Sequence, residues 1–319
     1  MNNQVVDVLV LGGGPSGLTA GIYTGRAGLS TLLLAGNPPG GQLMWSSEVE
    51  NFPGFPEGIT GPELIMAMRQ QAEKFGVQIV DENVRKVSGS FEKGFGLLTD
   101  EGKVLKGRTL IVAAGASARW LELPSEQKLR GKGVSACAVC DGFFFKNKVV
   151  AVVGGGDVAF EEALYLTKFA GKVYLLIRGG KEQVKACKAL QDKVRSNAKI
   201  ELKYHTEVVE VLGSDVVTGL KIKDNSTGQE TAMDDVRGLF VAIGHKPNTE
   251  FLVSEGVSLI ALGKFGYAEP QAGTQTHTIQ SGVFVAGDVS DHRYRQAITA
   301  AGFGCMAALD CIRFLSEKA

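Results

Sequence analysis

The sequence is poor in cysteine and proline and has no excess of charge of either sign. Only 5 of its 319 residues are cysteine and 9 are proline, which argues against the dense disulfide framework of a small secreted domain. The 34 Lys and Arg residues balance the 34 Asp and Glu residues. Because general binding to nucleic acid or to anionic lipid requires a basic excess, we expect neither nucleic acid nor a membrane among the partners.

Targeting and membrane signals are also lacking. Met1 to Val6 offers neither a basic segment nor an apolar core, so no signal peptide is expected there. Residues 8–25 carry no charge, but glycines and a proline interrupt this run between positions 12 and 17. A strand, a turn and a helix explain the run better than a membrane span. The low cysteine count and the missing signal together predict a cytoplasmic protein.

Glycine, by contrast, is abundant. The 42 glycines among 319 residues make up about 13% of the chain, where about 7% is usual. The glycines have no three-residue period, which excludes collagen, and a hydrophobic content of 44% excludes disorder. The excess must therefore serve a folded protein, and this length predicts about two domains.

The first glycine cluster lies in a strand, turn and helix pattern. The valine-rich run Val5–Leu11 predicts a buried strand, and the turn Gly12–Gly17 follows it. A helix is predicted over Leu18–Ala27 and a second strand over Thr31–Leu34. This is a βαβ unit whose glycines would let the backbone approach a pyrophosphate at the start of the helix.

A second copy of the pattern begins about 140 residues later. The strand Val149–Val153 leads into the turn Gly154–Ala159, followed by a helix over Phe160–Phe169 and a strand over Val173–Ile177. One such glycine motif is a weak signal on its own, but two copies in the same strand and helix context are much stronger.

The rest of the chain completes these two units. Thr109–Ala114 and Gly238–Ile243 are predicted to be matching closing strands, and no third fingerprint precedes the predicted helix Gln296–Leu315. We therefore predict an α/β fold with two Rossmann-like, three-layer ββα dinucleotide-binding domains, the second inserted into the first. The first domain would comprise residues 1–116 and 246–319, and the inserted domain residues 117–245.

Neither unit has the acid that usually binds the ribose of NAD. Ala35 ends the second strand of the first unit and Arg178 ends that of the second, so the standard ribose contact is not supported. Arg178 would suit the 2′-phosphate of NADP, although a single arginine after a strand is often only a solvated charge.

Cys137 and Cys140 are separated by two residues, as in redox-active dithiols. Zinc is the alternative, but no further cysteine or histidine lies at ligand spacing, so no metal is expected. Asp141 could move a proton beside the pair or cap a helix, and both interpretations stay open. The remaining cysteines are interpreted as buried or incidental thiols: Cys187, Cys305 and Cys311.

The ordered set of motifs resembles the low-molecular-weight thioredoxin reductase family over essentially the whole chain. It consists of Gly12–Gly17, Gly40–Leu43, Glu48–Gly54, Cys137–Gly142, Gly154–Asp157, Gly287–Asp288 and Tyr294–Ala297. The resemblance implies that FAD is bound by Gly12, Gly14, Ser16, Gly17, Gly40, Gly41, Gln42, Asn51, Val84, Gly287, Asp288, Arg295, Gln296 and Ala297.

The resemblance also implies a route for electrons, from NADPH to FAD, then to the Cys137–Cys140 disulfide, and then to thioredoxin. Cys140 would face the flavin, Cys137 would attack the partner disulfide, and Asp141 would manage the proton. The inserted domain would carry these cysteines, and the protein would be a homodimer.

The chain departs from the family pattern where NADPH would bind. Val158 replaces the usual serine, and Gly179 replaces the second arginine of a His-Arg-Arg run. Since an arginine fork grips phosphate and lysine is only a point charge, NADPH binding would be weaker or absent, unless Arg178, Lys181 and Lys185 compensate. The candidate residues are Gly154, Gly156, Asp157, Arg178 and Lys185, and the donor stays open between NADPH and another reductant such as ferredoxin.

Aromatic residues form a second departure. Trp45 or Phe303 could stack near the flavin in place of the nicotinamide, while Trp120 and Phe143–Phe145 are expected to pack. Two alternative functions are a flavin disulfide reductase for another thioredoxin-like or peroxidase-linked partner, and a flavin-binding sensor without turnover. The intact cysteine pair argues against the sensor.

Overall fold

A computed structural model describes residues 5–318 and divides the chain into two compact units. The first unit comprises Met1–Ser117 and Lys246–Ala319, and the second comprises Ala118–His245. The α/β class and the insertion of one Rossmann-like unit into the other are confirmed. Two short strands, β7 (Ala116–Ala118) and β16 (His245–Pro247), pair where the chain passes from one unit to the other and back. Residues 1–4, which belong to the segment tested for a signal peptide, lie outside the described part.

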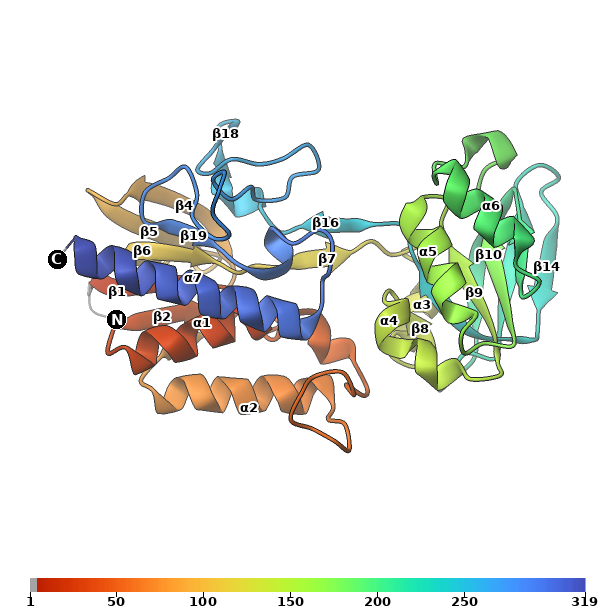
Figure 1. Cartoon of the computed structure of the whole chain (residues 1–319), viewed down its shortest axis with the longest axis horizontal. Coiled ribbons are helices and arrows are strands. Elements are labelled where there is room, and N and C mark those ends of the chain that lie inside the picture. Colours follow the sequence, from red (N-terminus) through yellow and green to blue (C-terminus); the bar gives the residue numbers. More distant parts are fainter. Residues whose placement is uncertain (1–4, 319) are drawn as a thin grey trace. The chain divides into compact units, whose positions relative to one another are not determined.

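A mainly parallel sheet forms the centre of the first unit (Figure 1). Its order is β3-β2-β1-β6-β5-β4, with β19 also parallel to β6. The buried valine and leucine runs of β1, β2 and β6 explain why helices can cover this sheet. The strands are β1 Val5–Leu11, β2 Thr31–Leu34, β3 Gln78–Val80, β4 Val84–Ser90, β5 Gly94–Thr99, β6 Val104–Val112 and β19 Val283–Val285, with a separate pair β17 Val253–Ser254 and β18 Val257–Ser258.

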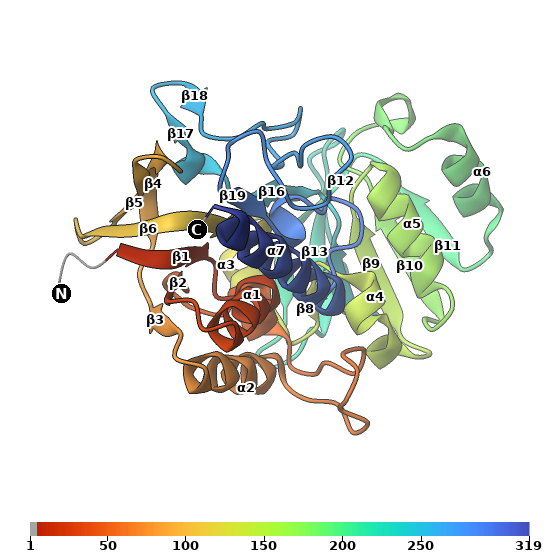
Figure 2. The same cartoon turned by 60° about the vertical axis from the view of Figure 1, so that its left-hand side comes forward.

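The described part of this unit contains three α-helices: α1 (Pro15–Arg26), α2 (Gly61–Lys74) and α7 (Ala297–Glu317). Helices α1 and α7 run side by side (Figures 1 and 2), and their contact is so close that a Cβ on Gly304 would lie 2.0 Å from the Ser16 carbonyl oxygen. Helix α7 is long and apolar enough to cross a membrane by length and composition. Core helices also meet that test, and one side of α7 is buried in the unit, including Ala307, Ala308 and Cys311.

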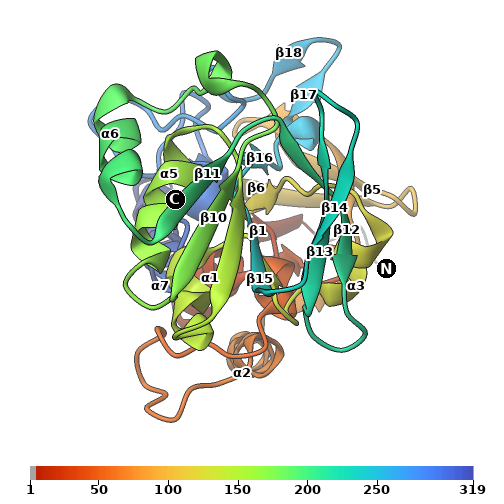
Figure 3. The same cartoon turned by 90° about the vertical axis from the view of Figure 1, so that its right-hand side faces the viewer.

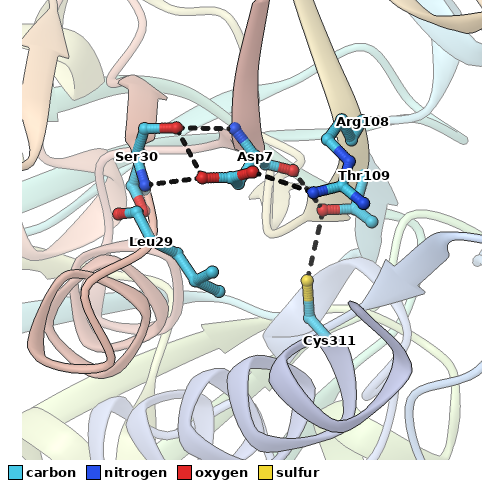
Figure 4. A network of polar contacts seen from close by, with 7 residues as sticks. Asp7, Leu29, Ser30, Arg108, Thr109 and Cys311 are labelled. Carbon is cyan, nitrogen blue, oxygen red and sulfur yellow. Dashed lines mark hydrogen bonds and ion pairs between the residues drawn. The ribbon is translucent and has the colours of Figure 1, made fainter. Parts of the chain in front are cut away.

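A polar network fastens the first strand to its neighbours (Figure 4). The Asp7 carboxylate accepts hydrogen bonds from the Ser30 backbone N–H at 3.0 Å and hydroxyl at 2.7 Å, and it pairs with Arg108 at 3.2 Å. The Thr109 hydroxyl donates to the Asp7 carbonyl at 2.7 Å and lies 3.3 Å from the Cys311 sulfur. Burial alone would raise the pKa of Asp7, but these hydrogen bonds outweigh it and hold the pKa below its usual value. This explains the single charge in the valine-rich strand.

The second unit has the three layers expected of a ββα domain (Figure 3). Helices α5 (Asp157–Leu166) and α6 (Lys188–Ser196) cover a parallel sheet of order β11-β10-β9-β15-β8, and an antiparallel sheet of β12, β13 and β14 forms the third layer. Its strands are β8 Val134–Ser135, β9 Val149–Val153, β10 Lys172–Leu176, β11 Ile200–Lys203, β12 Thr206–Leu212, β13 Gly219–Asp224, β14 Glu230–Met233 and β15 Val236–Val241.

Both predicted helices that follow the glycine turns begin earlier than expected. Helix α1 starts at Pro15 rather than Leu18, and α5 starts at Asp157 rather than Phe160. Pro15 occupies the first helical turn, where its missing N–H leaves no carbonyl unpaired and its fixed φ fits the helix. The first turn of each helix therefore lies inside the glycine motif itself.

Candidate functional site

The first glycine turn connects β1 to α1 and leaves room for a ligand at one position. Gly12 has a φ of 125°, and a Cβ there would lie 2.1 Å from the Ala113 carbonyl oxygen. A Cβ on Gly17 would lie 1.9 Å from the Gly12 carbonyl oxygen. At Gly14, the residue that precedes α1, a Cβ would meet nothing within 4 Å. The backbone is thus tightly packed on the protein side and open at Gly14, which suits a phosphate at the start of the helix.

Two buried polar atoms lie near the start of α1 without a partner among residues 5–318. They are the Ser16 hydroxyl and one carboxylate oxygen, Oδ1, of Asp288. Gly287 allows their elements to approach, since a Cβ there would lie 2.9 Å from the Ser16 Cβ. Burial, and the negative charge of nearby Asp291, raise the pKa of Asp288 to about 7. Buried polar groups normally have hydrogen-bond partners, so these atoms fit a cofactor that carries phosphate and hydroxyl groups.

Other predicted flavin residues come together from distant parts of the chain. The Asn51 side chain donates to Gln296 Oε1 at 3.3 Å, although the two residues are 245 positions apart. Gln296 precedes α7, which begins at Ala297, and Arg295 lies just before it with a φ of 48°. Asn51 and Gln296 therefore lie side by side in the first unit, and their contact with FAD stays a prediction.

Loops after the first strands border the same turn. A Cβ on Gly41, the first residue of a 3₁₀ turn that runs to Trp45, would be 3.9 Å from the Gly14 Cα. The Gln42 side chain, next to Gly40 and Gly41, donates to the Ala116 carbonyl.

Val84 begins β4 and follows Asn83, a residue that sequence reasoning missed. The Asn83 side chain accepts a hydrogen bond from the Asn37 N–H at 2.9 Å and so ties the start of β4 to the loop after β2. An asparagine beside a predicted contact residue was the only available signal.

The second glycine turn has the same backbone form but different neighbours. Gly154 has a φ of 152°, and a Cβ there would lie 2.4 Å from the Ala242 carbonyl oxygen, whereas Gly156 is open. The Asp157 carboxylate, at the first position of α5, accepts the Cys187 N–H at 2.7 Å. The Gly155 carbonyl accepts the N–H groups of the residues just before Cys187, Lys185 at 2.8 Å and Ala186 at 3.1 Å. The turn is therefore bonded to the chain that follows β10.

The segment that follows β10, residues 178–188, carries the side chains proposed from sequence to bind NADPH. The Gln183 side chain accepts the Gly180 N–H at 3.0 Å and fills the space beside Gly179, where a Cβ would lie 2.0 Å from Gln183 Oε1. The nearby cations are exposed and form no ion pair within the described chain: Arg178, Lys181, Lys185 and Lys188. The segment thus offers unneutralised positive charge but no pair of arginines.

Cys137 and Cys140 are joined by a disulfide in the second unit, with their Cα atoms 5.3 Å apart. They flank a short helix, α4 (Ala138–Asp141), and the Cys140 N–H lies 3.2 Å from the Cys137 sulfur. Ser135, another residue missed from sequence, accepts the Cys137 N–H at 3.0 Å. Cys140 is exposed and Cys137 is half-buried.

Asp141 lies directly after the pair. Burial raises its pKa, and a hydrogen bond with the Ser135 side chain opposes this shift only in part. Asp141 also precedes a 3₁₀ turn over Gly142–Phe145, but its side chain forms no capping hydrogen bond there. The capping interpretation is therefore wrong, and the proton-transfer role stays a prediction.

The remaining cysteines and aromatic residues singled out from the sequence differ in how deeply they are buried. Cys311 is buried, Cys305 is half-buried and Cys187 is exposed, and all three are free thiols. Phe145 packs in the core, whereas Phe143 is 55% exposed. The Arg130 guanidinium carbon lies 4.1 Å from the centre of the Trp120 ring. Phe303 packs against the hydrophobic core of the first unit, and Trp45 is exposed. Within residues 5–318, no three His, Cys, Asp or Glu side chains are grouped to hold a metal.

Comparisons with known proteins agree with this arrangement. Residues 6–304 match the family model described as pyridine nucleotide-disulphide oxidoreductase. The chain is 46% identical over 317 residues to a thioredoxin reductase of Mycolicibacterium smegmatis, covering 99% of both. It is 46% identical over 322 residues to NADPH-dependent thioredoxin reductase 3 of Arabidopsis thaliana, covering 98% of this chain but 59% of that longer protein. A solved thioredoxin reductase from Giardia duodenalis superposes with a TM-score of 0.89 at 40% identity, covering 98% of this chain and 99% of that one.

Proposed function

Since the chain belongs to the low-molecular-weight thioredoxin reductase family of pyridine nucleotide-disulphide oxidoreductases, we propose that it passes electrons through FAD and the Cys137–Cys140 pair to the disulfide of thioredoxin. The observation that carries the proposal is this disulfide, in which Cys140 is exposed and Cys137 is half-buried, with Asp141, an acid of raised pKa, beside it. A dithiol that closes reversibly at an accessible edge is what disulfide exchange requires.

The first unit would hold FAD. Gly14 and the start of α1 would receive the pyrophosphate, and Ser16 and Asp288 would supply the hydrogen bonds that the protein alone leaves unmade. Asn51 and Gln296 would contact another part of the cofactor. When bound, FAD supplies the exchange of electrons between a soluble donor and a disulfide.

The reduced cysteine pair would carry out disulfide exchange by its own chemistry. The Cys140 N–H beside the Cys137 sulfur would stabilise a Cys137 thiolate, which attacks one sulfur of the partner disulfide. Cys140 then gives up its proton, attacks Cys137 and reforms the Cys137–Cys140 disulfide. The partner gains two electrons and two protons, one proton from Cys140 through the neighbouring Asp141 and one from solvent.

An exposed apolar rim beside the disulfide supports a protein as the substrate. Val139 is 52% exposed and Phe143 is 55% exposed, and they lie on either side of Cys140 in the sequence. A thioredoxin or thioredoxin-like protein could cover these side chains while its disulfide meets the cysteine pair. A peroxidase-linked partner is the alternative that uses the same rim.

For the electron donor we propose NADPH, with a reduced ferredoxin as the second candidate. The cations around the second glycine turn form no ion pair within the described chain and favour a phosphorylated ligand such as NADPH. Gln183 fills the space beside Gly179 where a second arginine would bind phosphate, which favours ferredoxin. Anaerobic titration of the flavin absorbance with NADPH, NADH and reduced ferredoxin in parallel distinguishes them. Prompt bleaching of the flavin absorbance by NADPH would also show that neither Trp45 nor Phe303 blocks the nicotinamide from reaching the flavin.

Reduction of thioredoxin by the purified protein tests the function directly. The Cys137→Ser variant should lose disulfide reduction while its flavin is still reduced, whereas a sensor without turnover would be indifferent to the change. We also propose a homodimer, on the resemblance alone, which a measurement of mass in solution checks. The three free thiols support the proposed reducing, cytoplasmic setting.

A further inference from the structure

A buried carboxylate lies in the loop that joins β19 to α7, and the protein's backbone uses both of its oxygens. Asp291 is 8% exposed. Its Oδ1 accepts the N–H groups of Arg293 and Tyr294, each at 2.9 Å, and its Oδ2 accepts the Arg295 N–H at 3.2 Å. Its own N–H donates to the Gly287 carbonyl at 2.9 Å. Asp291 therefore ties three of the four residues that follow it to the turn that precedes it.

Asp291 and the three residues bonded to it, Arg293, Tyr294 and Arg295, are called the cradle below, and the last of them has an unusual backbone. Arg295 has a φ of 48°, in the left-handed region that side chains with a Cβ rarely adopt. Such a conformation persists only where its surroundings impose it. The hydrogen bond from the Arg295 N–H to Asp291 Oδ2 at 3.2 Å is one contact that holds this conformation.

The conformation of Arg295 decides how the next residues leave the loop. Gln296 follows immediately, caps α7 and accepts the Asn51 side chain at 3.3 Å. The side chains of His292, Arg293 and Tyr294 are exposed, so the loop contributes little to the core. The buried carboxylate thus bonds to the backbone that leads into residues 295–297, and the charge of Arg295 partly opposes the raised pKa of Asp288.

We propose that Asp291 is a positioning residue of the flavin site, which holds Arg295 in its left-handed conformation and thereby orients Gln296 and Ala297 toward FAD. The proposal rests on the proposed FAD site in the first unit. Both Asp291 oxygens already accept backbone N–H groups, so the role assigned to it is to position its neighbours rather than to bind the cofactor. Its role is to pre-organise the contacting residues before the ligand arrives.

The Asp291→Asn variant tests the proposal. Asparagine keeps an oxygen for Arg293 and Tyr294 but places an N–H₂ group against the Arg295 N–H, so of the three hydrogen bonds only the last is lost. The variant also removes the negative charge that raises the pKa of Asp288, which is why a second background is needed. We expect FAD to bind the flavin-free variant about tenfold more weakly, measured by quenching of flavin fluorescence. Asp310→Asn, which removes a carboxylate on α7 that binds Thr276, is the matched control and should leave FAD affinity unchanged. Equal FAD affinity in wild type and Asp291→Asn would overturn the proposal.

Testing Asp291→Asn in a second variant, Arg295→Gly, distinguishes a positioning role of Asp291 from a general loss of structure. Glycine adopts a φ of 48° without strain, so in an Arg295→Gly background the Asp291→Asn change should weaken FAD binding much less than in wild type. Equal losses in both backgrounds would contradict the proposal. If Asp291→Asn does not fold, hydrogen exchange of the wild-type, flavin-free protein decides. The Arg293, Tyr294 and Arg295 amides should be protected, and free exchange would refute the cradle. Failure of wild type to bind FAD would instead refute the proposed site.

Discussion

The two glycine turns of this chain have the same backbone form and different surroundings. In the first, the Ser16 hydroxyl and Asp288 Oδ1 are buried without partners within the described chain. In the second, the Asp157 carboxylate binds the Cys187 N–H and the Gly155 carbonyl binds Lys185 and Ala186. The first turn is thus incomplete without a ligand, whereas the second is largely satisfied by its own chain. A glycine motif specifies the turn, but the neighbouring side chains decide how strongly a ligand is required.

The largest expected effect comes from the first turn itself. Gly12→Ala should destabilise the flavin-free protein by more than about 4 kcal/mol, because the new Cβ meets the Ala113 carbonyl at a φ that alanine rarely adopts. Thermal unfolding measures the loss.

Gly14→Ala is the matched control, since its Cβ meets nothing within 4 Å. It should leave the unfolding temperature of the flavin-free protein nearly unchanged but lower FAD affinity, because the methyl group occupies the ligand's side of the turn. Equal stability losses for Gly12→Ala and Gly14→Ala would mean that the open side of the turn is not a ligand site.

The next effect concerns Asp288. Its pKa is raised to about 7 in the folded protein by burial and by Asp291, while the unfolded carboxyl ionises near its usual value. The flavin-free protein should therefore lose stability between about pH 4 and pH 7, as only the unfolded state releases the proton, and the loss should be constant above pH 7. Asp288→Asn removes this penalty and should gain roughly 2 to 4 kcal/mol relative to wild type over that range.

Denaturant unfolding of both proteins at several pH values measures the difference between their free energies of unfolding. The contributions of the other titrating groups cancel in this difference, because both proteins contain them. Parallel stability curves for wild type and Asp288→Asn would show that this carboxyl is not an unsatisfied acid, and the contrast between the two turns would lose its main support.

Sequence reasoning reached the backbone of both turns but not the difference between them. The strands Val5–Leu11, Thr31–Leu34 and Val149–Val153 were predicted with the bounds that the structure has, because short apolar runs with a glycine at or near their end leave little choice. The partners of Asp157 and Gln183 could not be predicted, since each depends on how a later loop folds back. Asp291 was equally hidden, because a lone aspartate in a charged loop resembles a solvated residue.

A gain of function would sharpen the comparison at the second turn. Gly179→Arg alone should improve NADPH binding little, because its side chain meets Gln183 at once. Combined with Gln183→Ala, it should lower the KM for NADPH about tenfold, since two adjacent arginines can then grip the 2′-phosphate. Steady-state reduction of an artificial acceptor measures the KM, with NADH as the control donor that should not respond. A tenfold gain in the single variant would show that Gln183 does not obstruct this place.

The smallest expected effect is at Gly156, the counterpart of Gly14. Its Cβ would also meet nothing within 4 Å, so Gly156→Ala should fold as well as wild type. If NADPH lies on this turn, the added methyl group should raise its KM about threefold, equivalent to about 0.7 kcal/mol, which is less than the loss of FAD affinity expected from Gly14→Ala. The effect is smaller because the unpaired cations nearby attract phosphate over a longer range than one backbone contact. Steady-state kinetics with NADPH and with reduced ferredoxin measure it. An unchanged KM for NADPH would place the donor elsewhere and leave the first turn as the one that binds a nucleotide.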